Sequence, residues 1–179
     1  MIYKTVGIVA AKEHSKRFPN KNIYSLGNVP LFWHSVLPLL DSIMVDDVYV
    51  VTDSVSIMDY CYKKNVKVIW RFKNANHDEE PLLDVLKYAY KTLLKSYDNI
   101  ITIMANCPLH TIMDVDNAIN LINSSDFLEV RSFNSDKKES GLMVFKESVI
   151  LTSPSISSHL GAIQTQGYEI HTKEDIRWI

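Results

Sequence analysis

The residues with the clearest chemical potential lie in one loop, residues 10–22, which we call the basic loop. It follows the apolar run Val6-Gly7-Ile8-Val9 and contains one acid, Glu13, among four long cations, Lys12, Lys16, Arg17 and Lys21. Cations so close together repel one another unless an anion lies between them. The carboxyl end of a strand in an open α/β sheet is where such folds bind phosphates. The basic loop therefore predicts a phosphate-chain site, the alternative being a solvated surface loop whose lysines contact no ligand.

The elements that must position this loop alternate between strand and helix. Apolar and β-branched runs predict strands at 4–9, 48–52, 66–70 and 99–104, and further strands at 127–131, 142–145 and 167–170. Helical periodicity and capping residues predict helices at 30–43, 54–65, 81–94 and 114–122, the last capped by Asp114. This alternation predicts an α/β fold with three α/β/α layers around an open, mostly parallel sheet.

Composition places the chain among ordinary globular proteins. Its 179 residues, 46% hydrophobic and 22% charged, suit one domain spanning residues 1–179. A net charge of -2 argues against a general binder of nucleic acid or acidic membranes, and no apolar run is long enough to span a bilayer. Cys61 and Cys107 lack the spacing of a metal or redox motif, and nothing resembles a signal peptide. We therefore expect a cytoplasmic protein with no nucleic-acid or membrane partner.

Two blocks of sequence resemble one enzyme family. The run Ser15-Lys16-Arg17-Phe18-Pro19-Asn20-Lys21-Asn22 is similar to the signature loop of the acylneuraminate cytidylyltransferases, the CMP-sugar synthetases. A second match, at the family's spacing, consists of Pro108, Leu109, Thr111, Asp114, Asp116, Ala118 and Ile119. The resemblance covers nearly the whole chain and implies a Rossmann-like, GT-A-like nucleotidyltransferase fold. Ala10, Lys12 and His14 depart from the family's Pro, Arg and Gly.

The resemblance also implies an activity and a set of nucleotide contacts. The activity is transfer of CMP from CTP to a sugar acid or a similar hydroxylated acceptor, in nucleotide-sugar biosynthesis. The resemblance makes Lys12 and Lys21 the catalytic cations, and its other nucleotide-binding residues are Ala11, Ser15, Lys16, Arg17, Asn22, Asp53 and Arg71. Two of these have alternatives: Asp53 as a simple helix cap, and Arg71 as a partner in a surface ion pair.

The acceptor site is where the chain departs most from the family. Asn106 and His110 are the candidate acceptor-binding residues by resemblance. Met104, Cys107 and His110 stand where the family has Gln, Ser and Arg, and a thioether cannot donate the hydrogen bonds of an amide. For Cys107 we favour a small packed side chain over a nucleophile, because no base is evident beside it. The sequence therefore predicts an altered acceptor pocket.

The resemblance places a divalent cation near the C-terminus. Glu169, His171 and Asp175 occupy the positions of the family's magnesium-binding acids. Alternation along a strand puts Glu169 and His171 on one face, where both side chains reach one ion. The resemblance implies Mg²⁺ as the cofactor. Mn²⁺ is the alternative, because a His nitrogen is a better ligand for manganese than for magnesium. The other interpretation is a polar pair at a strand end that binds no metal.

A short connection replaces a segment that family members use to reach across a dimer. Only Ser132–Ser140 joins the strand at 127–131 to the run Gly141–Lys146. So short a segment cannot form such an arm, so we expect a monomer or a homodimer formed through another surface. The competing functional hypothesis is a catalytically degenerate nucleotide-binding or interaction module of the same fold.

Overall fold

The computed structural model describes residues 3–72, 80–152 and 159–178. Within them, seven strands form one sheet in the order β5-β4-β1-β6-β8-β7-β9. Four parallel neighbours make up one half, β1 (Thr5–Ala10), β4 (Asp47–Thr52), β5 (Lys67–Trp70) and β6 (Asn99–Ile103). The other half consists of β7 (Glu129–Phe133), β8 (Glu139–Lys146) and β9 (Leu160–Gln164). Only β8 runs against the rest of this sheet, so the mostly parallel prediction is confirmed.

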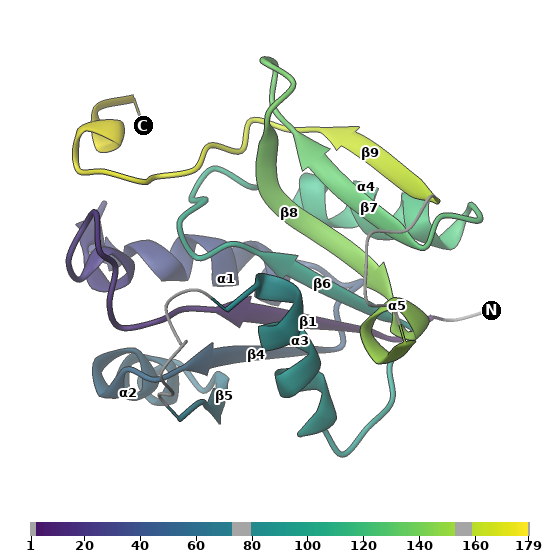
Figure 1. Ribbon diagram of the computed structural model, residues 1–179, viewed down its shortest axis with the longest axis horizontal. Coiled ribbons are helices and arrows are strands. Elements are labelled where there is room, and N and C mark those ends of the chain that lie inside the picture. Colours follow the sequence, from purple (N-terminus) through teal and green to yellow (C-terminus); the bar gives the residue numbers. More distant parts are fainter. Residues whose placement is uncertain (1–2, 73–79, 153–158, 179) are drawn as a thin grey trace.

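Helices cover the sheet on both faces and give the three expected layers (Figure 1). One face packs against α1 (Leu31–Asp41), α2 (Val55–Lys63) and α4 (Ile112–Asn123), and its core includes Phe32, Ile57 and Ile119. The opposite face packs against α3 (Leu82–Lys91) and α5 (Glu147–Thr152), around a core that includes Ile8, Leu86 and Ile100. Because β1 is buried on both sides, its sequence is a continuous apolar run rather than an alternating one.

Several elements differ from the sequence-based expectation. The predicted strand at 167–170 is wrong: these residues form no ladder, and β9 supplies the edge strand instead. Asp114 is not the cap of its helix, because α4 begins at Ile112 with Thr111 as the N-cap. Asp114 lies one turn further on and completes a capping box with Thr111. The small hairpin of β2 (Ser25–Leu26) and β3 (Val29–Pro30) and helix α5 were not predicted.

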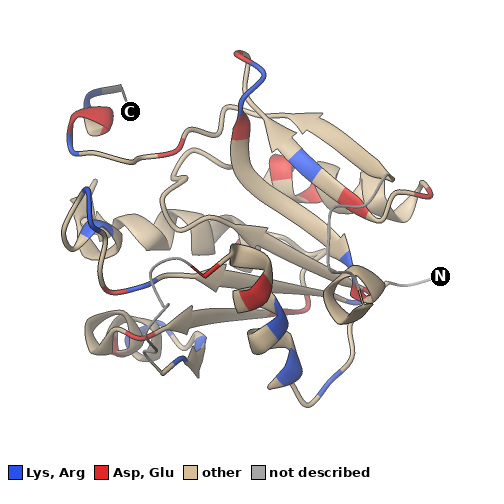
Figure 2. Cartoon of the chain, in the orientation of Figure 1, with Lys and Arg blue, Asp and Glu red and all other residues tan. Residues whose placement is uncertain are grey.

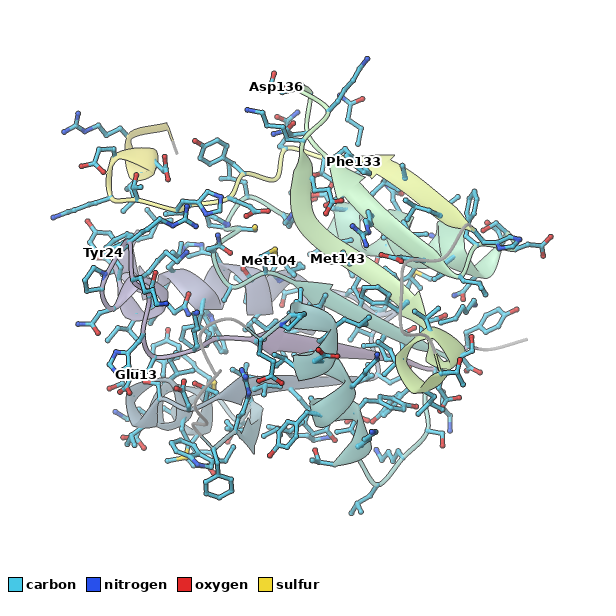
Figure 3. All side chains as sticks on the ribbon, in the orientation of Figure 1. Glu13, Tyr24, Met104, Phe133, Asp136 and Met143 are labelled. Carbon is cyan, nitrogen blue, oxygen red and sulfur yellow. The ribbon has the colours of Figure 1, made fainter. Side chains whose placement is uncertain are left out.

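A tight turn joins β7 to β8, as the short connection requires. The Asn134 side chain accepts hydrogen bonds from the backbone N–H groups of Asp136 and Lys138, at 3.0 and 3.1 Å, and Lys137 adopts a φ of 60°. The hairpin therefore closes on itself (Figure 3, Asp136), and no arm leaves the domain at this point. Across the described ranges, no helix has the length and apolar character needed to cross a membrane.

Candidate active site

A cavity of about 310 Å³ opens at the carboxyl ends of β1, β4 and β6, and we call it the main cavity. The chain leaves β1 for β4 on one side and later returns to β6 on the other, so this is the point where the strand order reverses. Open α/β sheets bind ligands at such a point. Eleven of the predicted site residues line the main cavity: Ala11, Lys12, Ser15, Arg17, Lys21, Asn22, Asp53, Arg71, Asn106, Glu169 and His171.

The basic loop forms one wall, and three hydrogen bonds fix its path. The Asn22 side-chain amide donates to the Lys12 carbonyl at 2.8 Å, and the Thr52 hydroxyl donates to the Ala11 carbonyl at 2.6 Å. The Glu13 backbone N–H donates to the Asp53 carboxylate at 2.7 Å. Figure 2 shows the resulting concentration of cationic segments after β1. Lys16 is exposed and does not line the main cavity.

Lys21 is held by a helical turn and by a hydrogen bond from its side chain. It begins the 3-10 helix Lys21–Ile23, and its ammonium group donates to the Ile170 carbonyl at 2.9 Å. Burial lowers the pKa of Lys21, and the nearby Arg17 and Lys12 lower it further, against Cys107 and Glu169, which raise it. An anion between these cations would offset both burial and mutual repulsion. The local electrostatics therefore favour a polyanion in the main cavity.

Asp53 and Arg71 have structural partners as well as places in the cavity wall. Ser54, not Asp53, is the N-cap of α2, and no side chain caps that helix, so simple capping by Asp53 is wrong. Asp53 instead ties the basic loop to the end of β4. Arg71 is 9% exposed and forms an ion pair with Glu80, so it both pairs and lines the main cavity.

The two acceptor candidates separate in space. Asn106 lines the main cavity, and its side-chain amide donates to the Ile170 carbonyl at 3.0 Å. His110 does not line it: the His110 ring is buried, with Nε2 2.6 Å from the Ser140 carbonyl oxygen. A Cβ atom at Gly167 would lie 2.5 Å from that ring, so His110 is tightly packed. Cys107 is a free buried thiol whose pKa burial raises, which fits a packed side chain.

The three metal candidates also separate. Glu169 and His171 both face the main cavity, with Glu169 Oε2 3.3 Å from His171 Nε2, and Arg17 lies 3.3 Å from His171 Nδ1. Asp175 turns away and accepts hydrogen bonds from the backbone N–H groups of Thr172 and His171, both at 2.7 Å, which lower its pKa. In the described part of the chain, no three His, Cys, Asp or Glu side chains gather closely enough to hold a metal ion. The assignment of all three side chains to one metal ion therefore stays a prediction, and only Glu169 and His171 line the main cavity.

Sequence reasoning missed some of the cavity wall. Glu80, Leu82 and Val85 come from the start of α3 and the residues before it, and Met104 and Ala105 come from the end of β6. Leu82 belongs to the apolar stripe that predicted the helix at 81–94, whereas Val85 does not, and such a stripe does not say which of its ends faces a ligand. Glu80 gave no sequence signal, because its role depends on Arg71, which follows another strand.

Comparisons with known protein sequences connect the chain to one enzyme family. The sequence model of the family described as "Cytidylyltransferase" matches residues 6–169. An N-acylneuraminate cytidylyltransferase from Streptococcus agalactiae serotype III is 27% identical over 144 residues, which cover 78% of this chain and 34% of that protein. The chain thus spans about a third of the length of that relative.

Two solved structures share the fold at low identity. A CMP:2-keto-3-deoxy-manno-octonic acid synthetase complexed with CTP superposes with a TM-score of 0.81 at 14% identity, covering 98% of this chain and 96% of that one. Rv0371c from Mycobacterium tuberculosis H37Rv, in complex with manganese, superposes with a TM-score of 0.72 at 12% identity, covering 98% of this chain and 97% of the other. The described chain therefore has the same fold as these two proteins.

Proposed function

The chain belongs to the cytidylyltransferase family, and on that premise we propose that it transfers CMP from CTP to a hydroxyl group of a sugar acid or a similar small acceptor. The observation that carries the proposal is the main cavity. It gathers Lys12, Arg17 and Lys21 around one space, with Ser15 and Asn22 beside them. A triphosphate is the ligand whose charge matches this wall, and a sugar hydroxyl is the nucleophile that the family resemblance implies.

The proposed reaction is an in-line displacement at the α-phosphorus of CTP. The acceptor oxygen forms a bond to that phosphorus, the bond to the bridging oxygen of the β-phosphate breaks, and the hydroxyl proton passes to solvent. Charge develops on the departing pyrophosphate, so the protein contributes mainly cations and positioning. We assign Lys12 and Lys21 to this charge and Asn106 to the acceptor, and the support is that these three side chains line the main cavity together with Arg17 and Arg71.

The donor set of the main cavity fits a divalent cation held partly by substrate. Magnesium is commonly bound through one or two carboxylates plus phosphate oxygens, so Glu169 alone satisfies the protein's share. His171 adds a nitrogen that favours manganese over magnesium. Such an ion would neutralise charge on the triphosphate oxygens. We assign Glu169 and His171, without Asp175, to this role.

The decisive experiment measures pyrophosphate release from each of the four ribonucleoside triphosphates, with magnesium and then with manganese, against a panel of 2-keto sugar acids. We expect release that requires CTP and one acceptor. Calorimetric titration with CTP provides the control for a folded, ligand-competent sample. Absence of CTP binding at millimolar concentration would overturn the proposal.

A specific observation supports one second candidate, a catalytically degenerate nucleotide-binding relative. His171 replaces one metal-binding acid, and Asp175 is occupied by backbone N–H groups, so the protein offers a single carboxylate to a cation in this part of the main cavity. CTP binding without pyrophosphate release, across all acceptors and both metals, would favour this candidate.

For the active protein we propose the cytoplasm as the compartment, consistent with two free, buried cysteines.

A further inference from the structure

The segment after β9, residues 165–171, brings Glu169 and His171 to the main cavity without joining the sheet. Figure 1 shows it as the extended yellow stretch between β9 and the C-terminal turn. Residues 165–171 belong to no helix and no strand, so no ladder sets the position of the two cavity-facing side chains. Because buried backbone groups need hydrogen-bond partners, the contacts that replace a ladder decide where this segment lies.

Asn106 binds the backbone of Ile170, the residue between Glu169 and His171, at two points. The Ile170 N–H donates to the Asn106 backbone carbonyl at 2.9 Å, and the Asn106 side-chain amide donates to the Ile170 carbonyl at 3.0 Å. The Ile170 side chain is fully buried and packs with Phe18 and Leu31. Moving this residue would expose its apolar side chain and leave buried polar groups unpaired, so Ile170 is a fixed point of the segment.

Lys21 shares the Ile170 carbonyl with Asn106. Its ammonium group donates to that oxygen at 2.9 Å, while Lys21 itself lines the main cavity. An ammonium group has three N–H donors, so this hydrogen bond leaves donors for an anion in the cavity. The Ile170 carbonyl therefore joins the basic loop to the segment that carries Glu169.

The segment reaches Ile170 through a closely packed glycine. A Cβ atom at Gly167 would lie 2.5 Å from the His110 ring and 2.8 Å from the Ser140 Cβ atom. The His110 ring is itself held by the Ser140 carbonyl, 2.6 Å from Nε2. No residue with a side chain fits at Gly167 without moving these neighbours. Glu169 therefore lies between two fixed points of the backbone, Gly167 and Ile170.

We propose that Asn106 is a positioning residue, which holds Ile170 in place and so keeps the Glu169 carboxylate facing the main cavity before any acceptor binds. The inference rests on the proposed function, in which Glu169 supplies the protein's share of a divalent cation site. Residues that orient a metal ligand affect the metal almost as strongly as the ligand does. This role is separate from a contact with the acceptor, because it acts on CTP and its cation when no acceptor is present.

The structural test measures amide hydrogen exchange in the unliganded full chain. In Asn106→Ala, the Ile170 amide should exchange about 10-fold faster, because the amide that holds its carbonyl is lost. The reference is the Leu142 amide, which donates to Ser132 Oγ at 2.9 Å within the sheet and should not change. Asn117→Ala, an exposed asparagine on α4, is the matched control and should alter neither amide.

A second variant separates the hydrogen bond from packing. Asn106→Asp keeps the shape of the side chain but puts an oxygen in place of the donor, so it should accelerate exchange at Ile170 as well. Unchanged exchange at Ile170 in both variants would overturn the inference. Equal acceleration at Leu142 would also overturn it, because Asn106 would then only stabilise the whole domain.

The binding test is calorimetric titration with CTP, without acceptor, in the absence and presence of saturating magnesium. The quantity compared is the ratio of the two CTP dissociation constants. This ratio should fall about 10-fold in Asn106→Ala, as in Glu169→Gln, and should stay unchanged in Asn117→Ala. Adding Asn106→Ala to Glu169→Gln should lower the ratio no further, because both changes act on the same carboxylate. An unchanged ratio in Asn106→Ala, or a further fall of similar size in the double variant, would overturn the inference.

The two proposals fail in different ways. If the unmodified protein releases no pyrophosphate and magnesium does not strengthen CTP binding, the proposed function fails, and exchange at Ile170 alone decides whether Asn106 positions the segment. If pyrophosphate is released and magnesium strengthens CTP binding, but Asn106→Ala changes neither exchange at Ile170 nor the ratio, the proposed function stands and this inference fails.

Discussion

The main cavity and a second pocket have opposite chemistry. The second pocket, of about 240 Å³, is lined by Leu82, Leu83, Met104, Glu129, Arg131, Met143, Phe145 and Val149. The main cavity is lined by Lys12, Arg17, Lys21 and Arg71, and the pKa of Lys21 is lowered by burial and by the nearby Arg17 and Lys12. In the second pocket Arg131 is closed off by two glutamates, and the rest of the wall is apolar. Both spaces contain cationic side chains, but only those of the main cavity crowd one another. An arginine in a wall is thus weak evidence for an anion site when carboxylates already pair with it, which holds for Arg71 with Glu80 as well as for Arg131.

The difference follows the halves of the sheet. The main cavity lies at the carboxyl ends of parallel strands, where successive loops converge and their charged side chains can lie close together. The second pocket lies over β7 and β8, where antiparallel pairing brings side chains of neighbouring strands face to face. There Glu129 and Arg131, two residues apart on one strand, share a face with Glu139 of the next, so the ion pairs form within the sheet itself.

The largest expected effect comes from removing a cation of the main cavity. Lys21→Ala should raise the CTP dissociation constant about 10- to 100-fold, because a charge-assisted hydrogen bond to a phosphate is lost. Calorimetric titration measures this change. The control is Lys16→Ala, which alters a lysine of the same loop outside the cavity and should change the constant by no more than about 3-fold. Equal losses in the two variants would show that the loop acts only through its net charge.

A smaller effect, on the magnesium dependence of CTP binding, should distinguish Glu169 from Asp175. The sequence predicted both carboxylates as metal ligands. Glu169→Gln should abolish most of the magnesium enhancement of CTP binding, about a tenfold effect, because it removes the carboxylate that faces the main cavity. Asp175→Asn should leave the magnesium dependence in place, since that side chain binds backbone N–H groups instead. The measurement is CTP titration across magnesium concentrations. Equal magnesium sensitivity in the two variants would return Asp175 to the metal site.

The lowered pKa of Lys21 gives the comparison a pH dependence. The Lys21 side chain loses its proton at a lower pH than a free lysine, whose pKa is 10.5. CTP affinity should therefore fall about 3- to 10-fold as pH rises through the lowered pKa of Lys21. The stability of the unliganded protein should instead increase as pH rises. The unfolded chain binds the proton more tightly, so the free energy of unfolding rises with pH between the folded pKa and 10.5.

Two measurements check this pair of trends. Titration with CTP between pH 7.5 and about 10 should show the decline, and the Lys21→Arg variant should lack it because arginine stays charged. Denaturant unfolding of the unliganded protein over the same range should show the rise. A decline of equal size in Lys21→Arg would assign the effect to another group.

The smallest expected effect concerns α4, which packs against β7, β8 and β9. It covers the face of the sheet opposite to the second pocket. Asp114→Ala should lower the free energy of unfolding by about 1 kcal/mol, because the capping box with Thr111 is lost, while CTP affinity stays unchanged. Burial would raise the pKa of Asp114, but His110 and the hydrogen bonds from Thr111 outweigh it and lower that pKa.

The pH dependence of this contribution has the opposite sign to that of Lys21. The stability from Asp114 is present above its ordinary pKa of 3.8 and is lost as pH falls through the lower folded value. Denaturant unfolding of Asp114→Ala and of the unmodified protein should therefore converge in acid. A constant difference down to low pH would mean that the lost stability came from packing and not from the carboxylate.

Much of the fold could be predicted because its signals are local. The apolar runs that became β1 and β4 and the stripe that became α3 reflect burial of adjacent residues, so periodicity was sufficient. The prediction of a strand at 167–170 was wrong, although polar and apolar residues alternate at Glu169, Ile170 and His171. The same alternation arises when a segment packs one side chain on a core without pairing to another strand. Ile170 is buried beside Phe18 and Leu31, which is what produces the pattern.

The sequence by itself determined the basic loop, since contiguous residues supply its cations and a strand must precede them. It also determined the alternation of elements and the family. The tertiary structure alone decided which candidates meet: Glu169 and His171 reach the main cavity, Asp175 and His110 do not, and Arg131 is paired. The physical reason is that hydrogen bonds and ion pairs form between residues far apart in the sequence. A side chain whose donors, acceptors or charge already have protein partners is less free to bind a ligand. Which partner lies within about 3 Å depends on how distant segments pack, which no local pattern records.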